Sequence, residues 1–265
     1  MLHGVFLPPF GELADPRGLA SLAARAEATG WDGFFLWDHV LRAGAPIAIA
    51  DPWIALAAIA VATTRLRLGP MVTPIVRRRP VKLARETVTL DHLSGGRLTF
   101  GAGLGVDSGR ELSGFGEVVD ERERAAILDE GLGLLTAMWT GEQVDHAGPE
   151  FIADAVTLLP RPLQTPRIPI WLAARTTNRA PLRRAARYDG LFAIEVAHDE
   201  LAAMTGFVEQ QRGSLDGFDV AVVDDGSRDP GADREVGVTW WMTDVGEGTS
   251  LAEVEARIED GPPLR

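Results

Sequence analysis

The order in which strand-like and helix-like segments alternate is the feature that most constrains how this chain can fold. Short apolar runs recur along the sequence, and most are followed by a segment with apolar residues at helical spacing. Strands that are apolar on both faces and alternate with helices indicate a parallel sheet covered by helices. Eight runs are predicted to be strands: residues 3–8, 33–39, 66–73, 97–103, 168–174, 190–196, 218–223 and 236–242. Eight parallel strands close most simply into a (β/α)8 TIM barrel, the α/β fold class that we predict.

Helix-start signals support this order. Asp15 followed by Pro16 is typical of an N-cap and a first helical position. Near the other end of the chain, Ser250 and Glu253 have the spacing of a capping box. Residues 224–235 are too polar and too short for a full helix, so we expect one helix of the barrel to be truncated.

Residues 104–167 interrupt the alternation after the fourth strand. They contain a glycine-rich loop, a helical pattern over Asp120–Trp139, and a predicted hairpin around the sequence HAGPEF at 146–151. We therefore expect an insertion of about residues 104–167 in the barrel. No linker divides the chain, so residues 1–265 are predicted to form one domain.

Composition excludes several classes of function. The formal net charge of −12 argues against nucleic acid as a partner, because nucleic-acid binding requires a basic face. With no cysteine, disulfides, thiolate metal sites and a thiol nucleophile are excluded. The sequence shows no charged-then-apolar leader and no run of about 18 apolar residues, so we expect a cytoplasmic protein with no membrane partner.

The predicted strand at 33–39 ends in the pair Asp38-His39, which would lie at the catalytic end of a barrel. His39 is the candidate catalytic residue, because a histidine pKa near neutrality suits proton transfer. The alternative is a hydrogen bond confined to the loop after this strand. Asp38 could orient His39 or bind a ligand, but neighbouring strand residues point in opposite directions, so at most one faces the barrel centre. No His, Asp or Glu cluster has metal-binding spacing, so no metal is predicted.

Three glycines follow one another at every second position where the predicted strand 97–103 ends. The spacing G-x-G-x-G of Gly101, Gly103 and Gly105 does not fit a dinucleotide-binding fingerprint, which needs G-x-G-x-x-G before a helix. Tight packing within the barrel alone could explain Gly101. For Gly103 and Gly105, close approach of a ligand is the favoured explanation over packing.

Two polar segments have alternative interpretations. The sequence ARTTN at 174–178 precedes a helix, where backbone N–H groups and hydroxyls can bind phosphate. Plain helix capping by Thr177 or Asn178 is an equal alternative. The arginine run at 77–79 is interpreted as a solvated loop before the helix that begins at Pro80.

Long stretches of the chain resemble the bacterial luciferase-like monooxygenase superfamily, whose members are FMN-dependent monooxygenases and F420-dependent oxidoreductases. The resemblance rests on LDHLSGGRLTFGAGLG at 90–105, AEATGWDGFFLWDH at 26–39, DPWIALAAIAVATTRLRLGPMVTP at 51–74 and LLPRPLQTPRIPIWLAARTTNRAPLRRAARYDGLF at 158–192. These segments occur in the order typical of the family. The resemblance implies a (β/α)8 barrel that binds reduced FMN or coenzyme F420.

The resemblance also implies where the cofactor binds. A flavin-type ring would lie at the C-terminal mouth of the barrel, supported by a bulge after the third strand that often contains a non-proline cis peptide. That peptide would fall within Pro70-Met71-Val72, at Met71–Val72. The positions that the family pattern assigns to the cofactor are Asp38, Met71, Val72, Gly103, Leu104, Gly105, Ala174, Arg175 and Thr176.

The function implied is oxidation or reduction of a small organic substrate, with a flavin or F420 reductase and a second copy of the chain as partners. FMN and F420 stay open as alternatives. F420-dependent sugar-phosphate dehydrogenases carry a glutamate directly after the glycine stretch, where this chain has Val106, and Glu111 lies too far along to replace it. A sugar substrate is therefore doubtful. A non-catalytic flavin-binding or accessory barrel is the alternative. A barrel enzyme without flavin is disfavoured, because Lys82 lies on an outer helix and no metal cluster is present.

Overall fold

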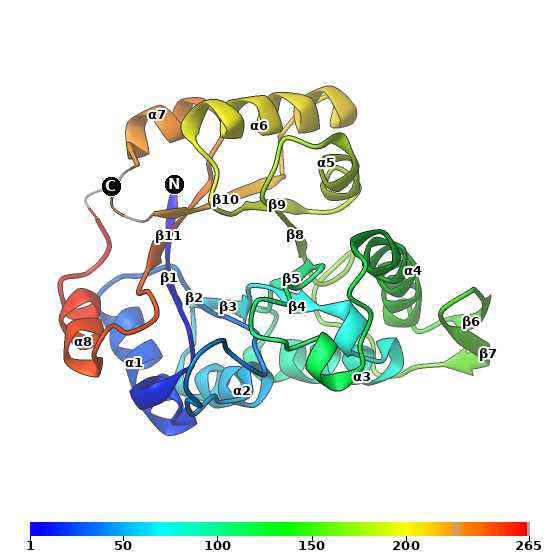
Figure 1. Ribbon diagram of the computed structural model, residues 1–265, viewed down its shortest axis with the longest axis horizontal. Helices are drawn as coiled ribbons and strands as arrows, with labels where there is room; N and C mark the ends of the chain where they lie inside the picture. The colour runs from blue at the N-terminus through cyan, green and yellow to red at the C-terminus, as the bar shows by residue number, and fades with distance from the viewer. Residues whose placement is uncertain (225, 227, 264–265) are drawn as a thin grey trace.

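The computed structural model describes residues 1–224, 226 and 228–263, and its centre is a parallel sheet that curls into a barrel (Figure 1). The strands lie in the order β3-β2-β1-β11-β10-β9-β8-β5-β4. They are β1 (Leu2–Leu7), β2 (Gly33–Leu36), β3 (Arg67–Pro70), β4 (Thr73–Pro74), β5 (Phe100–Gly103), β8 (Ile170–Ala174), β9 (Gly190–Ala193), β10 (Asp219–Asp224) and β11 (Trp240–Asp244). The backbone of Leu68 bonds to those of Arg97 and Thr99. This contact joins β3, at one end of the strand order, to the residues that lead into β5 near the other end, and confirms the predicted barrel.

The barrel has nine strand segments where eight strands were predicted, because the predicted strand 66–73 is divided in two. β3 ends at Pro70 and β4 begins at Thr73. The residues between them, Met71 and Val72, are joined by a cis peptide bond. β3 pairs with β2, whereas β4 pairs with β5. The interruption therefore lies where the chain passes from one partner strand to the other.

The described residues form eight α-helices, which lie around the barrel (Figure 1). They are α1 (Pro16–Ala28), α2 (Pro52–Ala62), α3 (Pro80–Ser94), α4 (Glu121–Trp139), α5 (Arg179–Ala185), α6 (His198–Arg212), α7 (Pro230–Glu235) and α8 (Leu251–Glu259). Asp15 caps α1 by accepting hydrogen bonds from two backbone N–H groups, and Ser250 forms the predicted capping box with Glu253. α7 has six residues, which confirms the truncated helix; positions 225 and 227 of that polar stretch lie outside the described residues.

Residues 104–167 contain α4 and the hairpin β6 (Gln143–Ala147) and β7 (Ile152–Thr157), which confirms the predicted hairpin. The hairpin forms a separate sheet at the edge of the molecule, beyond α4 (Figure 1). The Glu130 carboxylate of α4 holds it by accepting hydrogen bonds from His146 Nε2 at 2.9 Å and from the Phe151 backbone at 2.8 Å. The description of the whole segment as an insertion, and of residues 1–265 as one domain, stays a prediction.

Several strands are shorter than the apolar runs that predicted them. The last run was placed at 236–242, but β11 begins at Trp240. The four residues before it form the exit from α7, where the Val238 backbone N–H bonds to the carbonyl of Asp233. An apolar sequence therefore continued through a turn, which hydrophobic periodicity alone does not distinguish from a strand.

The hydrophobic core has two layers, one inside the barrel and one between the sheet and the helices. The buried side chains of the inner cluster are Phe6, Phe35, Met71, Trp171, Phe192, Ala221, Trp240 and Met242. Trp241 belongs to the outer layer, and its Nε1 donates to Asp224 at 3.2 Å. Trp240 and Trp241 are thus core residues on opposite faces, as the alternation of strand side chains predicts.

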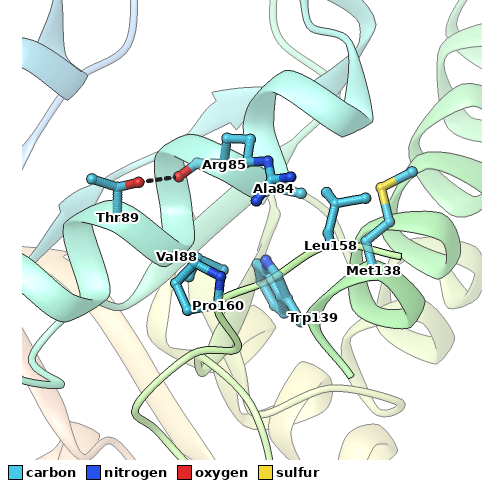
Figure 2. Close-up of a pocket in the computed structure, with 8 residues that line it drawn as sticks. All are labelled: Ala84, Arg85, Val88, Thr89, Met138, Trp139, Leu158 and Pro160. Atoms are coloured by element: carbon cyan, nitrogen blue, oxygen red, sulfur yellow. Dashed lines mark hydrogen bonds between the residues drawn. The ribbon is translucent and has the colours of Figure 1, made fainter. Parts of the chain in front are cut away.

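A small cavity of about 40 Å³ lies between α3, α4 and the segment that follows β7 (Figure 2). Its walls include Val88, Trp139 and Pro160, and Arg85 and Thr89 contribute its polar side. These residues are on the outside of the barrel, on the helices that cover the sheet. The cavity is therefore separate from the C-terminal ends of the strands, where the candidate site was predicted.

Candidate active site

His39 lies just beyond the end of β2, and its imidazole is held from one side. Its Nδ1 is 2.8 Å from Oε1 of Glu111. The ring lies 5.9 Å from the rings of Phe10 and Trp37, measured between centroids. The side chain is 16% exposed, and Nε2 makes no hydrogen bond to any of the described residues. One nitrogen of His39 is thus fixed by the protein, and the other is free to meet a ligand.

Glu111 comes from the loop after β5 and is almost completely buried, with 2% of its side chain exposed. Its Oε2 accepts hydrogen bonds from Arg77 Nη1 at 2.6 Å and from the backbone of Val40 at 3.3 Å. Burial raises the pKa of Glu111, but the hydrogen bond from His39 and the charges of His39 and Arg77 outweigh it. The net pKa lies below the ordinary value of 4.5, so Glu111 is an ionised acceptor at neutral pH.

The Asp38 side chain is buried in an ionic cluster with Arg77 and Arg78. Its carboxylate accepts hydrogen bonds from the Thr73 hydroxyl at 2.8 Å and from Arg78 at 2.8 Å. Arg77 reaches the other oxygen at 3.1 Å and the Asp38 backbone carbonyl at 2.8 Å.

The interpretation of residues 77–79 as a solvated loop was wrong for two of the three arginines. Residues Ile75–Arg77 form a 3-10 helix, and Arg77 is 7% exposed. Arg78 is also largely buried, and only Arg79 is exposed. The physical reason is charge pairing, because Asp38 and Glu111 offset the cost of burying the two guanidinium groups.

The break between β3 and β4 lies at the mouth beside these groups. The cis peptide at Met71–Val72 confirms the position that the family resemblance implied. Met71 is buried in the inner cluster, whereas Val72 is partly exposed and packs on it. Whether these residues contact a cofactor ring stays a prediction.

Protein atoms at and beside this break account for the glycines at the end of β5. A Cβ atom on Gly101 would meet the carbonyl oxygen of Pro70, and one on Gly103 would lie 2.6 Å from a methyl group of Val72. Gly105 has a φ of +73°, which favours glycine, and a Cβ there would lie 2.9 Å from Pro74. Packing against protein atoms therefore accounts for these glycines, and the close approach of a ligand at Gly103 and Gly105 stays a prediction.

The backbone after β5 is held by a side chain of α4. The side chain of Arg124, on α4, donates to the carbonyl oxygens of Leu104 at 3.1 Å and Gly105 at 2.7 Å. Their carbonyls are therefore already bound within the protein. A cofactor contact at Gly103, Leu104 or Gly105 stays a prediction.

The segment after β8 is less tightly held. Ala174 is buried at the end of the strand, whereas Arg175 is exposed and forms an ion pair with Glu195 across the rim. The Thr176 hydroxyl accepts a hydrogen bond from the Asn178 backbone at 3.2 Å. Asn178 is the N-cap of α5, but its side chain makes no capping bond, so side-chain capping does not explain this segment.

The barrel mouth itself is largely apolar. Five partly buried side chains pack on the inner cluster: Trp37, Val72, Ala173, Ile194 and Val223. The Nε1 of Trp37 is buried and has no hydrogen-bond partner among the described residues. A flat ring with an apolar face and a polar edge fits such a surface, since it could cover the apolar walls and accept from Trp37. No group of three or more potential metal ligands occurs in the part of the chain that the structure describes.

The prediction from sequence missed Glu111 and Arg77 as members of this site. Glu111 is separated from His39 by 72 positions, and only the folded loop brings the two together. The one available signal was the presence of charged residues in a segment close to a barrel rim. Such a signal does not say which side chains are buried or paired.

The structure is a barrel that carries a histidine and an apolar surface at the C-terminal ends of its strands. It therefore belongs to the class of barrel proteins whose active sites are formed by the strand-to-helix loops. Residues 1–222 match the sequence model of the luciferase-like monooxygenases. The chain belongs to this family.

Curated relatives include F420-dependent glucose-6-phosphate dehydrogenases. The one from Nakamurella multipartita is 33% identical over 176 residues, which cover 65% of this chain and 50% of the relative. The one from Beutenbergia cavernae is 35% identical over 163 residues, which cover 60% of this chain and 47% of the relative. The chain thus spans about half the length of these relatives.

Solved structures share the fold over nearly the full chain. A monooxygenase from Streptomyces bottropensis has a TM-score of 0.79 at 21% identity, covering 98% of this chain and 97% of its own. The coenzyme F420-dependent tetrahydromethanopterin reductase from Methanopyrus kandleri has a TM-score of 0.78 at 19% identity, covering 97% and 96%. At this level of identity the similarity establishes the barrel. Within the described residues, no helix has both the length and the apolar character needed to span a membrane.

Proposed function

We propose that this protein is an oxidoreductase that uses coenzyme F420 or reduced FMN to act on a small organic substrate. The observation that carries the proposal is His39, which stands at the rim of an apolar barrel mouth with Nδ1 bound to Glu111 and Nε2 unbound. Family membership and the F420-dependent relatives support the cofactor class.

The cofactor, when bound, supplies hydride transfer or the oxygen chemistry of a reduced flavin. Trp37, Val72 and Ala173 would provide the surface for its ring, with Met71 behind them. His39 would donate or accept the proton at Nε2. Ala174, Arg175 and Thr176 would lie on the phosphate side, and Gly103, Leu104 and Gly105 beside the chain that links the ring to the phosphate. Asp38 would act indirectly, since its carboxylate is engaged by Thr73, Arg77 and Arg78.

The sugar phosphate named for the relatives is not the substrate we propose. Val106 follows the glycine stretch and has no charge or hydrogen-bonding group to offer a sugar. Hydroxyl groups that lose water without finding a protein partner disfavour binding. An apolar mouth is better suited to a small, weakly polar organic molecule.

The proposal extends to partners and location. Use of reduced FMN would require a flavin reductase, and use of F420 would require an F420 reductase or a second F420-dependent enzyme. A homodimer through outer helices is supported by α2, where Ile54 is 67% exposed and Val61 is 69% exposed on its outer side. We propose a cytoplasmic protein whose residues 1–265 act as one barrel domain.

A cofactor titration tests this function. The purified protein would be titrated with FMN, with reduced FMN under anaerobic conditions and with F420, and followed by fluorescence. We expect saturable binding of F420 or reduced FMN. Preference for F420 would direct the substrate search to alkenes, imines and alcohols, and preference for reduced FMN would direct it to oxygenation. Binding of none of the three would contradict the proposal and favour a non-catalytic accessory barrel.

A further inference from the structure

Both carboxylate oxygens of Glu111 are engaged by protein groups. One carboxylate oxygen is 2.8 Å from His39 Nδ1, and the other accepts from Arg77 and from the Val40 backbone. A buried side chain with both oxygens engaged has little freedom to move. The atoms that it contacts belong to the segment after β2 and to the 3-10 helix after β4, so Glu111 connects these two segments to its own loop after β5.

We propose that Glu111 is a positioning residue, which holds His39 in its Nδ1–H tautomer and thereby makes Nε2 the atom that exchanges a proton with the ligand. This inference rests on the proposed function, in which His39 transfers the proton. It assigns a role to a residue that the sequence pattern had set aside.

The tautomer follows from the chemistry of the pair. An ionised carboxylate has no hydrogen to donate, so the 2.8 Å contact requires the hydrogen to be on Nδ1. In the neutral ring Nε2 then carries the lone pair. Phe10 and Trp37 pack against the imidazole and limit its rotation, which keeps Nε2 in one direction.

Arg77 links the Glu111 carboxylate to Asp38. It binds Glu111 through Nη1 and Asp38 through Nη2, so the carboxylate is fixed relative to the strand that carries His39. The other charged groups near the ring are already paired, since Arg78 bonds to Asp38, and Arg42, whose guanidinium lies over Phe10, bonds to Glu247. Glu111 is thus the carboxylate that acts directly on His39 among the described residues.

Nitrogen-15 NMR of the histidine side chains tests this inference on the protein without any cofactor. A His39→Gln variant would assign the His39 signals among those of the five histidines. We expect the neutral ring to carry its hydrogen on Nδ1. A neutral His39 with its hydrogen on Nε2 would overturn the inference, and this result needs no variant at position 111.

The Glu111→Gln variant extends the test to the carboxylate that we propose holds the tautomer. An amide can donate as well as accept, so we expect a mixture of tautomers. Glu247→Gln is the matched control, because it removes another rim carboxylate paired with an arginine and should leave the His39 signals unchanged.

A merely structural role for Glu111 predicts that the Glu111→Gln variant has a lower melting temperature with the tautomer of His39 unchanged, and that result would overturn the inference. The cofactor titration separates this outcome from failure of the proposed function. Absence of cofactor binding together with the Nδ1–H tautomer would reject the function and leave the positioning of His39 by Glu111 supported.

Discussion

Replacing His39 with alanine should reduce turnover of the bound reduced cofactor by about 10²- to 10⁴-fold, the usual contribution of a general acid or base. Cofactor affinity should change little, because the mouth is formed mainly by apolar side chains of other strands. The measurement is the steady-state rate of cofactor oxidation with a substrate found by screening, together with the dissociation constant from fluorescence.

His198 provides the matched control for this experiment. It also lies at the C-terminal side of a barrel strand, and its Nδ1 is bound to a buried carboxylate, that of Asp233, at 2.8 Å. His198→Ala should retain the parental turnover, because His198 begins α6, is half exposed and is not among the described side chains that pack on the inner cluster. Equal turnover of the parent and His39→Ala would exclude His39 from proton transfer.

Replacing Arg77 with methionine should lower the free energy of unfolding by about 3–5 kcal/mol, the usual cost of removing one partner from a buried ion pair. Arg77 neutralises two buried carboxylates, those of Asp38 and Glu111. Methionine has a similar length but leaves Glu111 without its cationic partner. Chemical denaturation of the parent and the variant would measure the difference.

Arg79 is the control within the same run of arginines, because it is exposed at the start of α3. Arg79→Met should change stability by less than about 0.5 kcal/mol, as is usual for surface substitutions. If the two variants were equally stable, the ionic cluster around Arg77 would have no net role in holding the rim together.

The barrel could be predicted from sequence because its determinants are local. Apolar runs, the N-cap Asp15 and the capping box at Ser250 each depend on residues a few positions apart. The division of the third strand was visible only through the family resemblance, because Met71 and Val72 have the same apolar character as the strand around them.

The site was harder to predict because its contacts are long-range. His39 could be placed at a strand end, but Glu111 and Arg77 reach it only through loops that the sequence does not fix. Three adjacent arginines suggest solvent exposure, yet two of them are buried against carboxylates. These carboxylate partners lie 34 to 40 positions away in the sequence, so local patterns do not reveal the pairing. Gly103 shows the same limit, since the atom that requires a glycine there belongs to Val72, in the break between β3 and β4.

Filling the barrel mouth tests most directly the claim that the cofactor binds there. Ala173 lies near the end of β8 among the apolar walls, so Ala173→Trp would place a large ring in the proposed cofactor position. Ala252→Trp, on the exposed side of α8, adds the same side chain away from the mouth. Each protein would be titrated with F420 and with reduced FMN, after thermal melting shows that it is folded. We predict that Ala173→Trp loses cofactor binding while Ala252→Trp retains it; parental affinity in a folded Ala173→Trp would contradict a cofactor site at the mouth.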